Sequence, residues 1–395
     1  MTEITKKPAS TNTTRSSTNE KIRYHYLDNL RALAMMFGIF FHAALAYDPL
    51  MHNLWFTADA EQSSVLGAIT WFLHSFRMQL FFLIAGFFAC YLSQKRGGRG
   101  LIKNRSLRIV LPFAVFLPLI LIAYDHSISL AIETVENQSP LLAIFAYFAE
   151  HPEQAPEPAL TASHLWFLYY LMMFYLVSVV FRKINLFRFP AFSSPKVFLA
   201  VPPLLLMPAL LTQLSPVPAA QTMMPEFWMF GYYGLFFWFG WYFFGNRDLI
   251  DQLKPYGKLI FAVAILAYAA FYFLIPQTFT LEEALKSPEL TPMHALTTFL
   301  GAIVSVYSVI TCLLVGKRYL DKQNKALRLI SDSSYWIYLI HLPLLFYIQF
   351  ALLDKDWSMW TKFAISSGSV VAIGFISYLF LVRWTPIGWV LNGRK

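Results

Sequence analysis

Charged residues are scarce in this chain. They make up 13% of its 395 residues, about half the share that soluble domains carry. Hydrophobic residues make up 57%, more than a soluble chain of this length could hide from water. Cysteine is also scarce, and because Cys90 and Cys312 both lie inside apolar runs, neither a disulfide framework nor a metal cluster is implied. The sequence therefore predicts an all-α polytopic membrane protein without a metal site.

About ten apolar stretches are long enough, or nearly so, to cross a bilayer. They lie near 29–48, 66–92, 107–124, 164–181, 197–215, 227–245, 259–275, 293–315, 330–350 and 359–382. A further apolar segment, 141–149, is too short to cross and is interpreted as a re-entrant or interfacial piece.

The distribution of Lys and Arg predicts the orientation of these stretches. Of the 31 basic residues, only Lys286, Lys355 and Lys362 fall on the side opposite the two termini, apart from Arg31 and Arg77 within the stretches themselves. Basic loops face the cytoplasm, so both termini are predicted to be cytoplasmic. This segregation also accounts for the net charge of +9 without a nucleic-acid partner.

The chain divides into a tail and one membrane-embedded domain. Residues 1–26 are polar and rich in Ser and Thr, which predicts a disordered cytoplasmic tail. Residues 27–395 are predicted to form the domain. No signal peptide precedes the first apolar run, so that run is interpreted as a retained membrane helix in a multi-pass protein of the bacterial inner membrane.

The first stretch, LDNLRALAMMFGIFFHAALAYD, carries ionisable residues at helical spacing. Arg31 and His42 are eleven residues apart, which returns to within about 20° of the same helix face, about 16 Å further along. Asp28 lies one turn before Arg31 on the same face. In lipid, such a face must point into a protein interior or an aqueous cavity, so the other helices are predicted to enclose it.

The second stretch carries His74 and Arg77 one turn apart, deep in an apolar run. An arginine near the bilayer centre needs a partner. Two interpretations stay open for Arg77. In the first it binds substrate or stabilises an oxyanion, and in the second it has a structural role and ties helices together.

Two further motifs flank the bilayer. At the start of the third stretch, Lys103, Arg105 and Arg108 form a basic cluster suited to a phosphorylated donor, or simply the usual positive-inside pattern. On the opposite side, SHLWFL places His164 and Trp166 at a helix start, where Trp serves either as a membrane-belt residue or as a surface for a sugar ring. The glycines of RGGRG at 96–100 are interpreted as a flexible connector.

The ninth stretch reads SDSSYWIYLIHLP. Ser334, Tyr338 and His341 share one helix face, and Pro343 predicts a kink. His341 is a second mid-membrane histidine in addition to His42, and the presence of two favours proton-transfer chemistry. The depth order of these residues predicts a phosphorylated donor on the cytoplasmic side, a base at mid-depth, and a sugar acceptor on the outer side.

At these residues the chain resembles the acyltransferase-3 family of integral membrane proteins, from about residue 24 to 383. The spaced Arg and His of the first stretch, FFLIAGFFA, RSLRIVLP, SHLWFL and SYWIYLIHLP carry the resemblance. Within the family it looks most like the glucan biosynthesis protein C subgroup. One position departs from some members, which have a second His where this chain has Leu342.

The resemblance implies transfer of an acyl group from cytoplasmic acyl-CoA, acetyl or succinyl, to a hydroxyl of an extracytoplasmic carbohydrate. The subgroup implies succinylation of periplasmic glucans. Acyl-CoA would be a donor substrate, and no permanently bound cofactor is expected. On this hypothesis His42 is the general base. Arg31, oriented by Asp28, would hold the phosphates of coenzyme A or set the tilt of the first helix. His341 and Tyr338 would orient the acceptor or share the proton.

Other interpretations stay open from the residues alone. Acetylation of another surface polysaccharide or of a lipid-linked sugar would use the same chemistry. Direct transfer and a covalent serine intermediate are both compatible, although no GxSxG motif is present. A transporter of a small anionic solute would explain the intramembrane Arg and His equally well. A receptor or structural protein that uses polar residues between helices is a third class.

Overall fold

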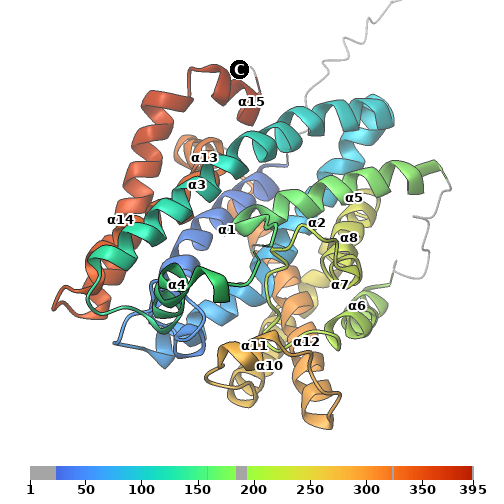
Figure 1. Ribbon diagram of the computed structural model, residues 1–395. Helices are drawn as coiled ribbons and strands as arrows, with labels where there is room; N and C mark the ends of the chain where they lie inside the picture. The colour runs from blue at the N-terminus through green and yellow to red at the C-terminus, as the bar shows by residue number, and fades with distance from the viewer. Residues whose placement is uncertain (1–23, 158, 184–193, 323, 394–395) are drawn as a thin grey trace, which may run out of the picture.

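A computed structural model describes residues 24–157, 159–183, 194–322 and 324–393. The predicted tail therefore lies almost wholly outside the described residues. The described part of the chain is helical and contains no β-strand, only one isolated bridge between Thr161 and Thr222. The helices (Figure 1) are α1 His25–Ala44, α2 Ser64–Arg105, α3 Leu111–Thr134, α4 Pro140–Glu150, α5 Trp166–Lys183, α6 Pro195–Leu210, α7 Phe227–Gly231, α8 Tyr233–Gly245, α9 Leu249–Leu253, α10 Gly257–Leu274, α11 Leu281–Leu285, α12 Pro292–Val315, α13 Lys325–Leu353, α14 Met359–Ser377 and α15 Pro386–Asn392.

Each of the ten predicted stretches coincides with helix. Seven helical runs of the described residues are long and apolar enough to cross a membrane, and one of them, Ser64–Thr134, covers two predicted stretches. The stretches 197–215 and 227–245 correspond to shorter helices, α6 and the α7–α8 pair. The segment 141–149 forms α4, an eleven-residue helix. The protein is thus an all-α polytopic membrane protein.

The connector between the second and third stretches is helical on both sides of a kink at Gly97. α2 runs on through RGGRG, and a π-helical turn, Ser106–Val110, joins it to α3. The break comes from Gly97, whose φ of 69° lies in the left-handed region that favours glycine. The chain therefore changes direction at one residue while its backbone hydrogen bonds continue on both sides.

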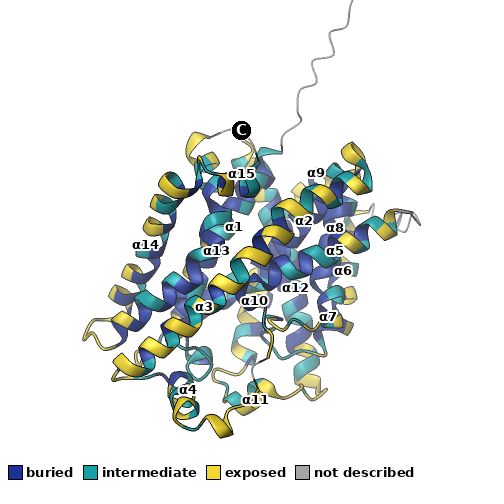
Figure 2. Ribbon diagram, turned by 45° about the horizontal axis from the view of Figure 1, so that its top comes forward, coloured by how far each residue is buried: buried dark blue, intermediate teal, exposed yellow. Residues whose placement is uncertain are grey.

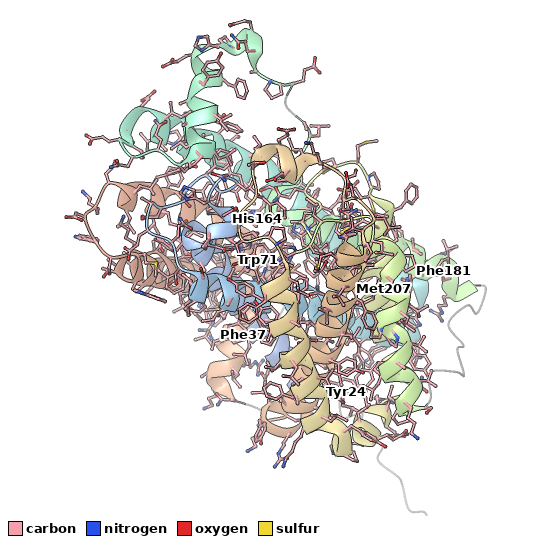
Figure 3. The ribbon with its side chains drawn as sticks, turned by 90° about the horizontal axis from the view of Figure 1, so that it is seen from below. Tyr24, Phe37, Trp71, His164, Phe181 and Met207 are labelled. Carbon is pink, nitrogen blue, oxygen red and sulfur yellow. The ribbon has the colours of Figure 1, made fainter. Side chains whose placement is uncertain are left out.

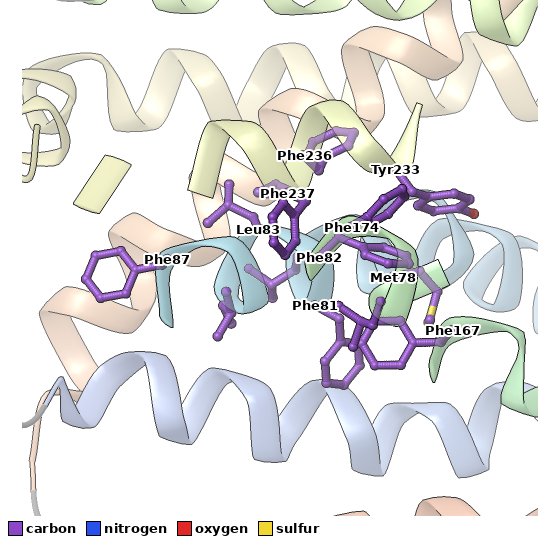
Figure 4. Packing of buried hydrophobic residues seen from close by; sticks show 14 of the residues in the cluster. Met78, Phe81, Phe82, Leu83, Phe87, Phe167, Phe174, Tyr233, Phe236 and Phe237 are labelled. Carbon is purple, nitrogen blue, oxygen red and sulfur yellow. The ribbon is translucent and has the colours of Figure 1, made fainter. Parts of the chain in front are cut away.

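Glycines bring α2 and α8 into backbone contact at the centre of the bundle. A Cβ on Gly86 would lie 1.8 Å from the carbonyl oxygen of Phe237, and one on Gly240 would lie 1.8 Å from that of Leu83. Such close approach is how membrane helices gain packing energy where the hydrophobic effect between helices is absent. Figure 4 shows the aromatic rings, among them Phe82 and Phe236, that fill the space around this contact.

The outward faces of the helices are apolar. Exposed side chains include Ile122 at 66%, Phe273 at 83% and Phe380 at 79%, and Figure 2 shows exposed residues along α3 and α14. Large exposed apolar surface of this kind fits a lipid environment. The start of α1 and the end of α15 lie at the same end of the bundle, since both line one cavity there, through Asp28 and Asn392.

Polar ties hold the loop 48–63, which connects α1 to α2, against α13 and α14. Lys362 donates to Asp59 at 2.7 Å in an ion pair whose side chains are 6% and 7% exposed. Nearby, the hydroxyl of Thr57 donates to Oε1 of Gln349 at 2.6 Å. Because this loop forms one wall of a cavity described below, these ties fix the shape of that cavity.

Candidate active site

Two cavities of similar size lie end to end between α1, α2, α5 and α13. The first, of about 530 Å³, is called the basic cavity, and its wall includes Asp28, Arg31, Arg96, Arg105, Arg108, Tyr175, Ser334 and Tyr335. The second, of about 540 Å³, is called the histidine cavity, and its wall includes His42, Trp55, Trp71, His74, Arg77, Tyr124, His164, Trp166, Tyr338 and His341. Both volumes fall in the range of small-molecule sites.

Three apolar side chains separate the cavities. Met35 from α1, Phe81 from α2 and Phe167 from α5 line both of them. The rings of Phe81 and Phe167 lie 5.6 Å apart between centroids, with their planes tilted by 55°, and are neighbours in Figure 4. These three residues are called the constriction. A ligand long enough to reach from one cavity into the other must pass between them.

The basic cavity presents cations without enough carboxylates to neutralise them. Arg31 contacts Asp28 at 3.6 Å and donates to the hydroxyl of Ser331 at 3.5 Å. The guanidinium of Arg105 lies over the ring of Tyr175, 4.8 Å from its centroid, and its Nε is buried without a hydrogen-bond partner. Guanidinium groups of this kind bind phosphate in a bidentate manner. The cavity is therefore suited to a phosphorylated ligand.

A pair of histidines occupies the histidine cavity. Nδ1 of His341 lies 2.6 Å from the carbonyl oxygen of Tyr338, which can only accept, so in the neutral ring this nitrogen carries the proton. Nε2 of His341 then accepts from Nδ1 of His42 at 2.9 Å. This leaves Nε2 of His42 as an acceptor for a ligand in the cavity. The arrangement fits a general base oriented by a second histidine.

Pro343 explains how His164 is held. A proline lacks the N–H that would bond to the carbonyl four residues earlier, which here belongs to Leu339. Nε2 of His164 donates to that carbonyl at 3.3 Å, and its Nδ1 accepts from the hydroxyl of Tyr124 at 2.9 Å. α13 accordingly continues through Pro343. With both ring nitrogens occupied, His164 acts as a fixed part of the wall.

The start of α5 supports this contact by a strained backbone. Ser163 has a φ of 47°, which is uncommon for a residue other than glycine, and its N–H donates to the hydroxyl of Thr161 at 2.9 Å. Ser163 begins a 3₁₀ turn, Ser163–Leu165, that leads into α5. Figure 3 places His164 and Trp71 near the middle of the molecule and Phe181 at its edge.

The sequence was compared with known proteins. The acyltransferase domain family, acyltransferase-3, matches residues 24–379. The chain belongs to this family. Among curated relatives, glucans biosynthesis protein C of Escherichia coli O157:H7 is 24% identical over 94% of this chain and 95% of its own length. The protein of the same name from strain K12 matches at the same identity and coverage. No solved structure matches.

The cavities thus belong to a multi-pass membrane acyltransferase. Most of the site residues predicted from the sequence line one of these two cavities. The histidine cavity takes His42, His74, Arg77, His164, Trp166, Tyr338 and His341. The basic cavity takes Asp28, Arg31, Arg105, Arg108 and Ser334. Lys103 is exposed and lies outside the wall of the basic cavity.

The positions of Ser334 and Trp166 differ in detail from those that the sequence suggested. Ser334 shares a helix face with Tyr338, but the two side chains reach different cavities, and the hydroxyl of Tyr338 donates to the carbonyl of His164 at 2.8 Å. Trp166 is 7% exposed and packs 5.3 Å from the ring of Tyr233, so it lies inside the bundle. Its ring therefore belongs to the cavity wall rather than to a membrane belt.

Sequence reasoning missed the constriction and Tyr124. Met35, Phe81 and Phe167 stand among many apolar residues, and nothing in their spacing separates them from lipid-facing neighbours. Tyr124 carries a weak signal, because it is a hydroxyl near the end of an otherwise apolar run of the third stretch. Only the contact with His164 shows its position in the site.

Proposed function

We propose that this acyltransferase moves an acyl group from acyl-CoA in the basic cavity to a carbohydrate hydroxyl in the histidine cavity. The observation that carries the proposal is the position of the His42–His341 pair in a cavity that meets the arginine-lined cavity at the constriction. The charge pattern of the loops supports a basic cavity open to the cytoplasm and an inner-membrane location.

The basic cavity would hold the phosphates of coenzyme A. Its wall includes Arg31 from α1, Arg105 at the end of α2, and Arg108 from the turn that follows α2. The thiol arm of coenzyme A is narrow and flexible, so it can extend between Met35, Phe81 and Phe167 with the thioester at its tip. The acyl carbon then reaches the neighbourhood of His42 while the charged nucleotide stays behind.

The reaction would proceed by attack of the hydroxyl on the thioester. Nε2 of His42 accepts the hydroxyl proton as the oxygen forms its bond to the acyl carbon. The tetrahedral intermediate collapses, the carbon–sulfur bond breaks, and the thiolate takes the proton to leave as free coenzyme A. Contact between His42 and His341 stabilises the imidazolium that forms in between. Direct transfer of this kind needs no covalent intermediate.

The acceptor is proposed to be a periplasmic glucan, and the acyl group succinyl. The glucan acceptor is proposed because the similar proteins are named glucans biosynthesis protein C. The aromatic wall of the histidine cavity, with Trp55, Trp71 and Trp166, supports a sugar ligand because ring faces stack on the C–H face of a pyranose. Acetylation of another surface polysaccharide is the alternative within the same chemistry.

Purified protein in detergent tests the proposal. It is mixed with succinyl-CoA or acetyl-CoA and a β-glucan oligosaccharide, and free coenzyme A and the mass of the sugar are followed. A gain of one acyl mass supports the whole proposal. Release of coenzyme A with an unchanged sugar rejects the glucan acceptor. No release with either donor rejects the acyltransfer scheme and favours transport of an anionic solute, measured by uptake into proteoliposomes.

A further inference from the structure

Arg77 is a buried cation without a counter-charge. Its side chain is 5% exposed, and no hydrogen bond or ion pair joins it to another residue of the described chain. Its Nε is buried without a partner, and its guanidinium lies over the ring of Phe41, 4.6 Å from the centroid. An aromatic face compensates a buried charge only in part. The guanidinium nitrogens thus remain available to an anion.

The surrounding wall offers no carboxylate. Among the described residues that line the histidine cavity there is neither Asp nor Glu, and Arg77 is the one Lys or Arg. The basic cavity differs, because Asp28 and Asp332 lie beside its arginines. A lone guanidinium in an acid-free, largely apolar cavity is an anion-binding site, since a bound anion removes an uncompensated charge.

The guanidinium lies between the constriction and His42. A Cβ on Gly38 would be 2.6 Å from Nη1 of Arg77, so the guanidinium occupies the space that this glycine leaves open. Gly38 precedes His42 by one helical turn, about 5.4 Å, and Phe81 follows Arg77 by one turn on α2. An acyl group that has passed the constriction therefore reaches Arg77 and His42 together.

We propose that Arg77 binds the terminal carboxylate of a dicarboxylic acyl group and so selects the donor. The proposal rests on the function proposed above. A four-carbon dicarboxylic chain places its carboxylate about 5 Å from its thioester carbon, close to one helical turn. The acyl chain turns back by one helical turn toward the constriction, so that its carboxylate binds Arg77 while the carbon to be attacked lies near Nε2 of His42. A carboxylate on the acceptor would be less well placed, because the acceptor enters from the end of the cavity opposite the constriction.

Selection follows from charge. A monocarboxylic acyl group of the same length leaves Arg77 buried and unpaired, and sites built around a polar contact reject analogues that lack it. Arg77 is thus a specificity-determining residue that acts in the ground state as well as during reaction. An oxyanion-stabilising role, in contrast, would accelerate every acyl group alike.

The test compares succinyl-CoA with butyryl-CoA, which have acyl chains of equal length. The wild type is expected to prefer succinyl-CoA by about 100-fold in kcat/KM. Arg77→Met keeps the volume and removes the charge. It should abolish the preference by lowering only the succinyl rate. Arg105→Gln is the matched control, which should lower both rates by the same factor and keep the preference. Equal loss of both rates in Arg77→Met would overturn the proposal.

Two further measurements keep the test decisive. If Arg77→Met does not fold, Arg77→Lys replaces it, and retains the charge but loses the bidentate geometry. It should reduce the preference to about 10-fold, and an unchanged preference would contradict the proposal. Thermal stabilisation by free succinate and by butyrate is read in parallel. Succinate alone should stabilise the wild type, and neither should stabilise the variant. This binding difference tests Arg77 even if no acyl-CoA is turned over, which would defeat only the proposed function.

Discussion

The two cavities differ in the number of charged side chains in their walls and in how far those side chains are exposed to water. The basic cavity combines four arginines with two carboxylates and is open enough that the side chain of Arg31 is 41% exposed. The histidine cavity is walled by aromatic rings and holds one buried arginine and the coupled pair His42 and His341. The basic cavity is suited to recognition of a charged ligand, because water lowers the cost of desolvation there. The histidine cavity is suited to proton transfer, because a low dielectric strengthens each polar contact.

Their construction also differs. Helices supply nearly all of the basic cavity, whereas the loop 48–63 and the segment 214–221 complete the histidine cavity. Loops need specific ties, and the buried pair Asp59–Lys362 provides one. Substitutions should therefore have different effects in three places. These are the basic cavity as the donor site, the histidine cavity as the site of the chemistry, and the constriction as the barrier between them.

The largest effect should come from His42→Ala. Loss of the base should lower acyl transfer by about 10³-fold, because a positioned base contributes roughly 10²–10⁴-fold. The protein should stay folded, since the ring lines a cavity rather than filling the core. The measurement is the mass of the acylated sugar against time. The control is His151→Ala, a residue just after α4 that lines neither cavity and should leave the rate unchanged. Near-normal transfer in His42→Ala would remove it as the base.

The next effect concerns stability. Lys362→Met should lower the free energy of unfolding by about 3 kcal/mol, since it leaves the carboxylate of Asp59 buried without its partner. The double variant Asp59→Asn with Lys362→Met should recover most of this loss. Thermal unfolding of the purified protein measures both. If the single and double variants were equally destabilised, the ion pair would not be the tie that holds this loop.

Arg105→Gln should affect the donor alone. Removing one phosphate contact should raise KM for acyl-CoA about 30-fold and leave kcat within about twofold, because a charge-assisted hydrogen bond contributes roughly 2 kcal/mol. Steady-state release of coenzyme A measures both constants. Lys258→Gln, an exposed cation near the start of α10, is the control for net charge. A fall in kcat at an unchanged KM would contradict a donor-binding role.

Phe81→Ala should give the smallest and most specific effect. A wider constriction admits water to the thioester, so release of coenzyme A without acceptor should rise about tenfold. Transfer to the sugar should continue. Leu107→Ala, an exposed side chain of the turn between α2 and α3, is the control of similar chemistry. An unchanged rate of hydrolysis would show that Phe81 does not separate the cavities.

The sequence predicted the ionisable residues of the site but not their partition. The spacing of Arg31 and His42 placed both on an inward face, because a helix in lipid cannot turn such groups outward. It could not show that Met35 divides that face into two compartments. The same limit applies to α13, where Ser334 and Tyr338 share a face but reach different cavities.

Backbone features were harder still to predict. RGGRG was expected to be a flexible connector, and the structure shows that the chain turns within it at one residue with positive φ, Gly97, where two helical segments meet at a kink. Pro343 was expected to kink its helix, and it also leaves the carbonyl of Leu339 free for His164. That long-range contact is revealed by no local pattern.

The central claim is that donor and acceptor meet from opposite ends of two cavities, and proteoliposomes test it most directly. A β-glucan oligosaccharide is trapped inside the vesicles with succinyl-CoA outside, and a second preparation holds both outside. The account predicts a gain of one acyl mass in the trapped sugar and none when both substrates are outside. Equal acylation with both substrates on the same side would contradict it.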